Sequence, residues 1–301
     1  MSDDIHLLSL VEVADAIAAR RLSAVEVMTA TVARAERLQP VLNCFISLEA
    51  EAAMEAAAAA DAALARGGEP GPLHGVPLAH KDMFYRTGHV TTCGSRIRKD
   101  FVPNHDSTAL ARLHQAGAIY LGGLNMAEFA TGPTGHNEHW GDCRNPWNQA
   151  HISGGSSSGS GSSVAGRVVF GALGSDTGGS VRLPSACNGV VGLKPTAGLI
   201  SRYGLMPLSH TLDTIGPLTR TVRDAARIVS AIAGHDPRDP TSSERPVPDY
   251  EAALAEDVNG LRIGVPSSYF YDVATAEVRG LLERSLDVRS KSPRTSAVAT
   301  S

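Results

Sequence analysis

The chain contains 301 residues, and 27 lysines and arginines against 31 aspartates and glutamates give a formal net charge of −4. Hydrophobic residues make up 43% of the sequence, which is enough for a sizeable core and excludes disorder for most of the chain. The mildly acidic balance gives no general attraction to nucleic acid or to an anionic membrane. We find no long apolar segment and no basic leader, so we expect no membrane span, no signal peptide and a cytoplasmic location.

The N-terminal quarter has the pattern of helices. Capping boxes at Ser9-x-x-Glu12 and Ser23-x-x-Glu26 precede apolar residues at helical spacing, which predicts helices over 9–20 and 23–38. An alanine-rich stretch predicts a third helix over 48–66.

From residue 74 onward, strand and helix patterns alternate. We expect strands over 75–81, 118–121, 167–173 and 261–265, and helices over 107–116, 221–234 and 274–286. This alternation predicts an α/β fold, with a mixed, largely parallel sheet flanked by helices and an N-terminal helical segment. Residues 289–301 have no periodicity and Val298 as their one large apolar residue, so we expect a disordered tail over 288–301 that could be non-native.

The cysteines and lysines of the chain indicate which kinds of functional site it can form. The four cysteines are spaced irregularly and form no Cys-x-x-Cys, which argues against a zinc ribbon, a redox dithiol or a disulfide framework. Only four of the basic residues are lysines, so a lysine within apolar sequence attracts attention. Lys81 is such a residue, and lysine, unlike arginine, can lose its proton when it is buried.

Two loops in the middle of the chain are rich in glycine and serine. Residues 153–163 are entirely Gly and Ser, a composition typical of flexible linkers, although apolar, patterned sequence flanks them on both sides. Residues 174–180 directly follow a predicted strand. A turn of this kind exposes backbone N–H groups and can display a nucleophile.

Neither loop fits a nucleotide-binding pattern, because neither contains lysine and no G-x-G-x-x-G follows a strand. A nucleophile elbow is an alternative, since Gly155-x-Ser157-x-Gly159 matches G-x-S-x-G. His210 or His235 would then be the base, but the segment before the motif is not strand-like.

A metal site is a weaker alternative. His136, Glu138, His139 and Cys143 lie close together in the sequence, but no H-E-x-x-H pattern is present. A polar loop accounts for them better, and we expect no metal and no cofactor.

The remaining candidates for a catalytic site are the serines of the two loops and Lys81, which apolar residues flank. Lys81 could simply pair with Asp82. Alternatively, burial lowers its pKa so that the neutral amine accepts a proton from a serine, as in Ser–Lys variants of the catalytic triad.

These segments together resemble the amidase signature family. The sequence GSDTGGSVRLPS at 174–185, followed by GVVGLKPT at 189–196, resembles the core motif of that family. GVPLAHKD at 75–82 is similar to the family's lysine loop, GGSS at 154–157 to its second serine loop, and GLNMAEFA at 123–130 to the stretch between them. The resemblance covers roughly residues 5–287 and implies the amidase signature fold.

The resemblance also implies roles for single residues. Ser180 would be the nucleophile, Ser156 a bridging serine after a cis peptide bond, and Lys81 the base of a Ser–cis-Ser–Lys triad. The remaining implied residues are the backbone N–H groups of an oxyanion hole at Thr177, Gly178, Gly179 and Ser180, and the supporting residues Ser157, Asp176 and Arg182.

The implied activity is hydrolysis of a carboxamide C–N bond through an acyl-enzyme, on a small-molecule amide. Family members are longer, so we expect one amidase signature domain over 1–287 that lacks the C-terminal part, and an inactive fragment is one alternative. The other is the glutaminase (A-type) subunit of a tRNA-dependent amidotransferase, which works with partner subunits. The resemblance leaves a homodimer open and implies no direct contact with nucleic acid. A binding-only module is the non-enzyme alternative.

Overall fold

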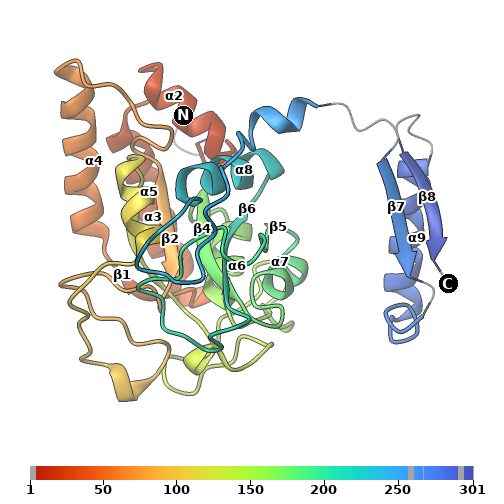
Figure 1. Ribbon diagram of the computed structural model, residues 1–301. Coiled ribbons are helices and arrows are strands. Elements are labelled where there is room, and N and C mark those ends of the chain that lie inside the picture. The colour runs from red at the N-terminus through yellow and green to blue at the C-terminus, as the bar shows by residue number, and fades with distance from the viewer. Residues whose placement is uncertain (1–4, 257–260, 267, 291–294, 301) are drawn as a thin grey trace. The chain divides into compact units, whose positions relative to one another are not determined.

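The computed structural model describes residues 5–256, 261–266, 268–290 and 295–300. The chain divides into two compact units, Met1–Glu251 and Ala252–Ser301, which we describe separately (Figure 1). The sequence predicted one domain over 1–287. None of the described helices has the length and apolar character that a membrane-crossing segment needs.

The first unit is built on a six-stranded sheet with the order β1-β3-β2-β4-β6-β5 (Figure 1). Strand β2 pairs in parallel with both of its neighbours, β3 and β4, while the outer pairings are antiparallel. The sheet is therefore mixed, as predicted, with its parallel pairings at the centre. The strands are β1 (Phe45–Leu48), β2 (Pro77–Lys81), β3 (Ile119–Leu124), β4 (Gly171–Asp176), β5 (Val191–Gly192) and β6 (Thr214–Thr219).

Helices flank this sheet. Contacts join α6 to β4 and β2, α4 to β3, and α8 to β6. The predicted capping boxes are present at the starts of α2 and α3, and Thr221 with Asp224 forms another at α8. The helices are α2 (Leu10–Ala18), α3 (Ala24–Leu42), α4 (Ala50–Ala65), α5 (Thr108–Gln115), α6 (Ser158–Ala165), α7 (Arg182–Asn188) and α8 (Val222–Ile232), with short 3₁₀ turns η1 (Arg96–Arg98) and η2 (Glu128–Ala130).

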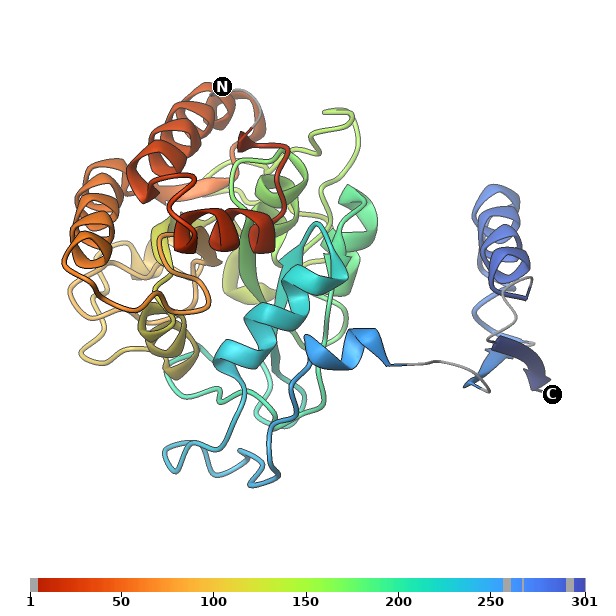
Figure 2. The same cartoon turned by 90° about the horizontal axis from the view of Figure 1, so that it is seen from above.

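Helices α2 and α8 are far apart in the sequence but lie side by side (Figure 2). The Asp224 carboxylate accepts a hydrogen bond from the Val11 N–H at 3.0 Å and, within its own capping box, one from the Thr221 N–H at 3.2 Å. One carboxylate therefore orders the beginnings of two helices at once.

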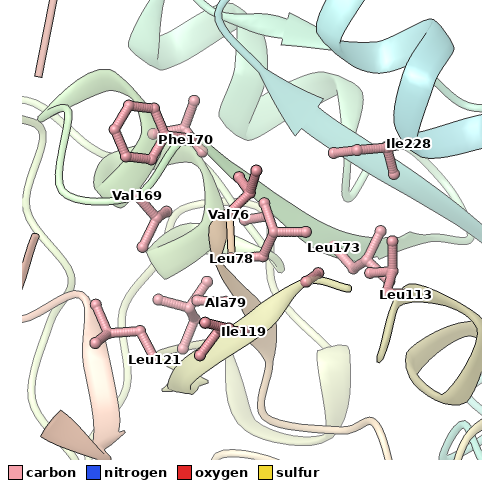
Figure 3. Packing of buried hydrophobic residues seen from close by; sticks show 14 of the residues in the cluster. Val76, Leu78, Ala79, Leu113, Ile119, Leu121, Val169, Phe170, Leu173 and Ile228 are labelled. Atoms are coloured by element: carbon pink, nitrogen blue, oxygen red, sulfur yellow. The ribbon is translucent and has the colours of Figure 1, made fainter. Parts of the chain in front are cut away.

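The core of the sheet is aliphatic. Leu78 of β2, Leu121 of β3 and Leu173 of β4 are buried with Phe170 and Ile228 (Figure 3). Burying each large apolar side chain contributes about 1.5–3 kcal/mol. This packing fixes the centre of the sheet, and with it the carboxyl ends of β2 and β4.

The second unit contains η3 (Ala252–Ala255), β7 (Leu261–Pro266), α9 (Ala276–Ser290) and β8 (Thr295–Thr300). Strands β7 and β8 pair in parallel. The predicted disordered tail at 288–301 thus contains the end of α9 and a strand, while 291–294 and 301 lie outside the described residues. Strand pairing uses backbone groups, so the lack of large apolar side chains does not prevent it.

The Gly/Ser run at 153–163 is buried throughout and continues into α6, so it is not a flexible linker. Its hydroxyl groups donate to backbone carbonyls: Ser158 to Asn125 (3.1 Å), Ser160 to Leu173 (3.1 Å) and Ser162 to Arg144 (2.7 Å). Short side chains let this helix lie directly against neighbouring backbone. A Cβ at Gly159 would meet the Cys44 carbonyl oxygen at 2.3 Å and the Asn125 nitrogen at 2.6 Å.

Gly159→Ala should therefore destabilise the protein, although alanine is the better helix former. The added methyl meets rigid backbone, and such overpacking costs about 1–3 kcal/mol. Chemical denaturation measures the free energy of unfolding. Ser163→Ala in the same helix is the matched control, because it removes only a long hydrogen bond of 3.4 Å to the Ser160 carbonyl. Equal stability of the two variants would contradict the close backbone approach.

Candidate active site

Lys81 lies at the carboxyl end of β2, next to the end of β4. Its side chain is fully buried. The Nζ atom donates hydrogen bonds to Ser156 Oγ at 2.6 Å and to Ser175 Oγ at 2.8 Å. The structure thus joins the predicted lysine to the predicted bridging serine and adds a third hydroxyl.

Burial sets the protonation of this amine. Desolvation lowers the pKa of Lys81 to about 7, while the negative charge of Asp213 acts in the opposite direction. Asp82, the ion-pair partner considered from the sequence, instead accepts hydrogen bonds from the backbone and hydroxyl of Thr92. Lys81 therefore has a substantial neutral fraction at neutral pH.

The peptide bond between Gly155 and Ser156 is cis, the conformation that the resemblance implies. Ser156 is fully buried, and its carbonyl accepts a hydrogen bond from the Ala127 N–H at 3.1 Å. A Cβ at Gly155 would lie 2.6 Å from the Gly132 carbonyl oxygen. Glycine at position 155 thus allows the 132–135 segment to pack against the serine.

The loop after β4 carries four of the predicted site residues, Thr177 to Ser180. Among the described residues, none accepts a hydrogen bond from the backbone N–H groups of this loop. Gly178 is exposed, and Gly179 has a φ of +146°, which glycine adopts without strain. The loop therefore has N–H groups without acceptors in the described part of the chain, and of its four residues Gly178 is the exposed one while Gly179 is buried.

Ser180 is partly exposed at the end of this loop. Its carbonyl accepts a hydrogen bond from the Ser157 N–H at 3.3 Å, which places it beside the serine loop. Within the described part of the chain, its hydroxyl has no hydrogen-bond partner. The structure thus brings Ser180 next to the residue after Ser156 and leaves its hydroxyl available.

Asp176 and Arg182 brace the loop. The Arg182 guanidinium donates two hydrogen bonds to the Asp176 carboxylate, at 2.9 and 3.0 Å, and the backbone N–H groups of Val181 and Arg182 donate two more, at 3.1 and 3.3 Å. Burial would raise the pKa of Asp176, but these donors outweigh it and hold the pKa below its ordinary value. The carboxylate of Asp176, the residue before the loop, is therefore joined to Val181 and Arg182, the residues after it.

The alternative sites are not assembled. The Ser157 hydroxyl donates to the Ser175 carbonyl at 3.2 Å, and His210 and His235 are exposed, so the nucleophile elbow lacks its base. In the suggested metal cluster, His139 instead pairs with Glu128 at 2.8 Å. No group of three or more His, Cys, Asp or Glu residues within the described ranges is arranged to hold a metal ion.

Two contacts of the site were missed in the sequence. Ser175 lies within the glycine-rich motif, but no role was assigned to it. A signal existed, because residues at the carboxyl ends of adjacent parallel strands lie together. Lys81 is the last residue of β2, and Ser175 is the last but one of β4. Asp213 lies far along the chain and gave no local signal.

A buried lysine between serines from separate glycine-rich segments, on a mixed sheet flanked by helices, agrees with the family resemblance. The chain belongs to the amidase family, since the family model described as Amidase matches residues 26–296.

Within this family, the chain is similar both to amidotransferase subunits and to a peptide amidase. The chain is 46% identical over 283 residues to the A-type subunit of the glutamyl-tRNA(Gln) amidotransferase of Syntrophobacter fumaroxidans, covering 94% of this chain and 58% of the relative. The peptide amidase of Stenotrophomonas maltophilia superposes with a TM-score of 0.90 at 35% identity, covering 97% of this chain and 61% of that chain. The A-type amidotransferase subunit from Thermotoga maritima gives 0.85 at 33% identity, covering 98% and 62%. The chain spans about three fifths of the length of these proteins.

The buried amine should make stability depend on pH. The unfolded chain has the ordinary lysine pKa of 10.5, so between pH 7 and 10.5 it binds more protons than the native state, whose Lys81 pKa is about 7. Native stability therefore rises with pH in this window. The wild type should gain about 2 kcal/mol relative to Lys81→Met between pH 7 and pH 9. Denaturant titrations at both pH values measure it, and a constant difference would show that the amine stays charged.

Proposed function

We propose that this chain carries a site that hydrolyses a carboxamide C–N bond through an acyl-enzyme on Ser180. The observation that carries the proposal is the 2.6 Å contact between the fully buried Lys81 amine and Ser156 Oγ. A neutral lysine at hydrogen-bond distance from a hydroxyl can act as a general base without histidine or metal.

The proton relay follows from this contact. Neutral Lys81 has a lone pair to accept the Ser156 proton while it donates an N–H to Ser175. Ser156 in turn takes the proton of the Ser180 hydroxyl, and Ser180 Oγ forms a bond to the amide carbonyl carbon. The C=O electron pair moves onto oxygen and creates an oxyanion.

The free N–H groups of Thr177, Gly178, Gly179 and Ser180 are proposed to stabilise that oxyanion. Each donor in such a hole typically contributes about 10²- to 10³-fold in rate. As the C–N bond breaks, the relay returns a proton to the departing nitrogen, and ammonia or an amine leaves. Water then attacks the acyl-enzyme and releases the carboxylic acid and Ser180.

Three further residues support this arrangement in the proposal. The Asp176–Arg182 pair holds the ends of the oxyanion loop, through contacts of 2.9 and 3.0 Å. Ser157 connects the two serine loops, because its N–H donates to the Ser180 carbonyl and its hydroxyl to the Ser175 carbonyl. We assign none of the three to proton transfer.

A fluorophosphonate probe tests the relay without knowledge of the substrate. It should label Ser180, with a rate that rises as the pH passes through about 7, the pKa of Lys81. Lys81→Met should slow labelling by at least about 10²-fold, which is typical of a lost general base. Peptide mapping identifies the labelled serine, and Ser163→Ala is the control.

Labelling of Ser157, with dependence on His210 or His235, would instead establish the nucleophile elbow. A folded chain that the probe does not label would support an inactive fragment or a binding module.

The curated relatives favour one setting for this chemistry, that of the A-type subunit of a glutamyl-tRNA(Gln) amidotransferase. Curated relatives that are 44–49% identical to this chain are such subunits, so we propose this role ahead of a stand-alone amidase. The solved structures do not separate the two roles, because the peptide amidase is 35% identical and the amidotransferase subunit 33%. The shared chemistry is the release of ammonia from a primary carboxamide, which in the amidotransferase role would be that of glutamine.

Ammonia release from glutamine separates the two roles. If the chain works within an amidotransferase, glutamine hydrolysis should require added partner subunits, and Lys81→Met should abolish it. Ammonia is measured in a coupled assay, with the unsupplemented chain as the control. Hydrolysis of simple amides by the chain alone, unchanged by partners, would establish the stand-alone amidase.

A further inference from the structure

The buried carboxylate of Asp213 precedes β6 and is only 4% exposed. It accepts hydrogen bonds from the Thr177 hydroxyl at 2.5 Å and from the backbone N–H groups of Leu208 and Ser209 at 2.8 and 3.0 Å. One carboxylate thus joins the loop at 208–213 to the first residue of the proposed oxyanion loop.

Strand pairing brings the two residues together. Strands β4 and β6 are antiparallel, and the last pair of the ladder is Asp176 with Thr214. Thr177 and Asp213 are the next residue on each strand, so they leave the sheet at the same point. The Thr177 side chain is therefore anchored while its backbone N–H has no acceptor among the described residues.

We propose that Asp213 is a positioning residue of this site: it holds Thr177 so that the oxyanion loop keeps its N–H groups directed at one point. The inference rests on the proposed function and deepens it. Asp213 acts through Thr177 and Lys81 and is not itself in the proton relay.

Asp213 differs from Asp176, the other carboxylate that raises the pKa of Lys81, in that it has no ion-pair partner among the described residues. Three groups raise the pKa of Lys81 against desolvation, and these are Asp213, Cys93 and Asp176, with Asp213 the strongest. Asp176 is paired with Arg182, and burial raises the pKa of Cys93 to about 12, so this thiol is neutral. Asp213 has no ion-pair partner within the described residues. The guanidinium beside it is that of Arg202, which donates to the Asp213 backbone carbonyl at 3.5 Å and pairs with Asp239.

Two substitutions separate the two effects. Thr177→Val removes the hydroxyl but keeps the β-branched shape and the charge on Asp213. Asp213→Asn removes the charge, which favours neutral Lys81, so the acid limb of the pH profile should move to lower pH. A role limited to stability would lower the melting temperature without moving this profile.

The test measures the rate of fluorophosphonate labelling against pH, together with the melting temperature. We expect Thr177→Val to label up to about 100-fold more slowly, with the acid limb unchanged, because small displacements of catalytic groups cost about that much. Thr177→Ser should recover most of the rate. Asp213→Asn should be slower at its plateau, with the acid limb shifted to lower pH.

The matched control is Thr108→Val. Thr108 donates a hydrogen bond of the same length, 2.5 Å, to the buried Asp236, which is also held by Ser201 and Arg238 and has no hydrogen bond to Lys81 or to the two serine loops among the described residues. It should lower the melting temperature and leave the labelling profile at the wild-type values.

The outcomes are distinguishable. Wild-type labelling of Ser180 combined with unchanged profiles in Asp213→Asn and Thr177→Val would overturn the role of Asp213 alone. If Asp213→Asn does not fold, Thr177→Val and Thr177→Ser decide the positioning role by the same measurement. A wild-type chain that no probe labels would overturn the proposed function and this inference with it.

Discussion

The burial of one amine is the constraint on which the rest of the site depends. Lys81 lies fully buried at the centre of the sheet, and Ser156 and Ser175 are its hydrogen-bond partners. An ammonium ion in this position would lose its hydration, so the pKa falls to about 7. The mixed sheet supplies the position, because parallel pairing of β2 and β4 sets their carboxyl ends side by side.

The two glycine-rich segments beside Lys81, the run at 153–163 that continues into α6 and the loop after β4, differ in how their polar groups are used. In α6, small residues allow backbone to approach backbone, and the hydroxyl groups satisfy carbonyls that would otherwise be buried without partners. In the loop after β4, the backbone donors are left free, and the ends of the loop are fixed by Asp176 and Asp213. The first segment thus packs closely against backbone, while the second keeps backbone donors without acceptors among the described residues.

Much of this could be predicted from the sequence, because the deciding signals are local. Capping boxes marked the starts of α2 and α3, and the motifs around Lys81, Ser156 and Ser180 indicated the segments that meet at the candidate site. Helix α6 was not predicted, since its Gly/Ser composition has poor helix propensity and tertiary packing decides its conformation. Asp213 was missed because its contact to Thr177 depends on strand register, which no short motif encodes.

The hydroxyl-lined interior of α6 also has a consequence for how such a protein can diversify. An aliphatic core tolerates exchanges of similar volume, because dispersion contacts have little directionality. Here the contacts are directional, and the neighbouring atoms are main chain, so the interior offers few acceptable substitutions. Sequence change would then fall to the surrounding surface loops, while α6 stays fixed.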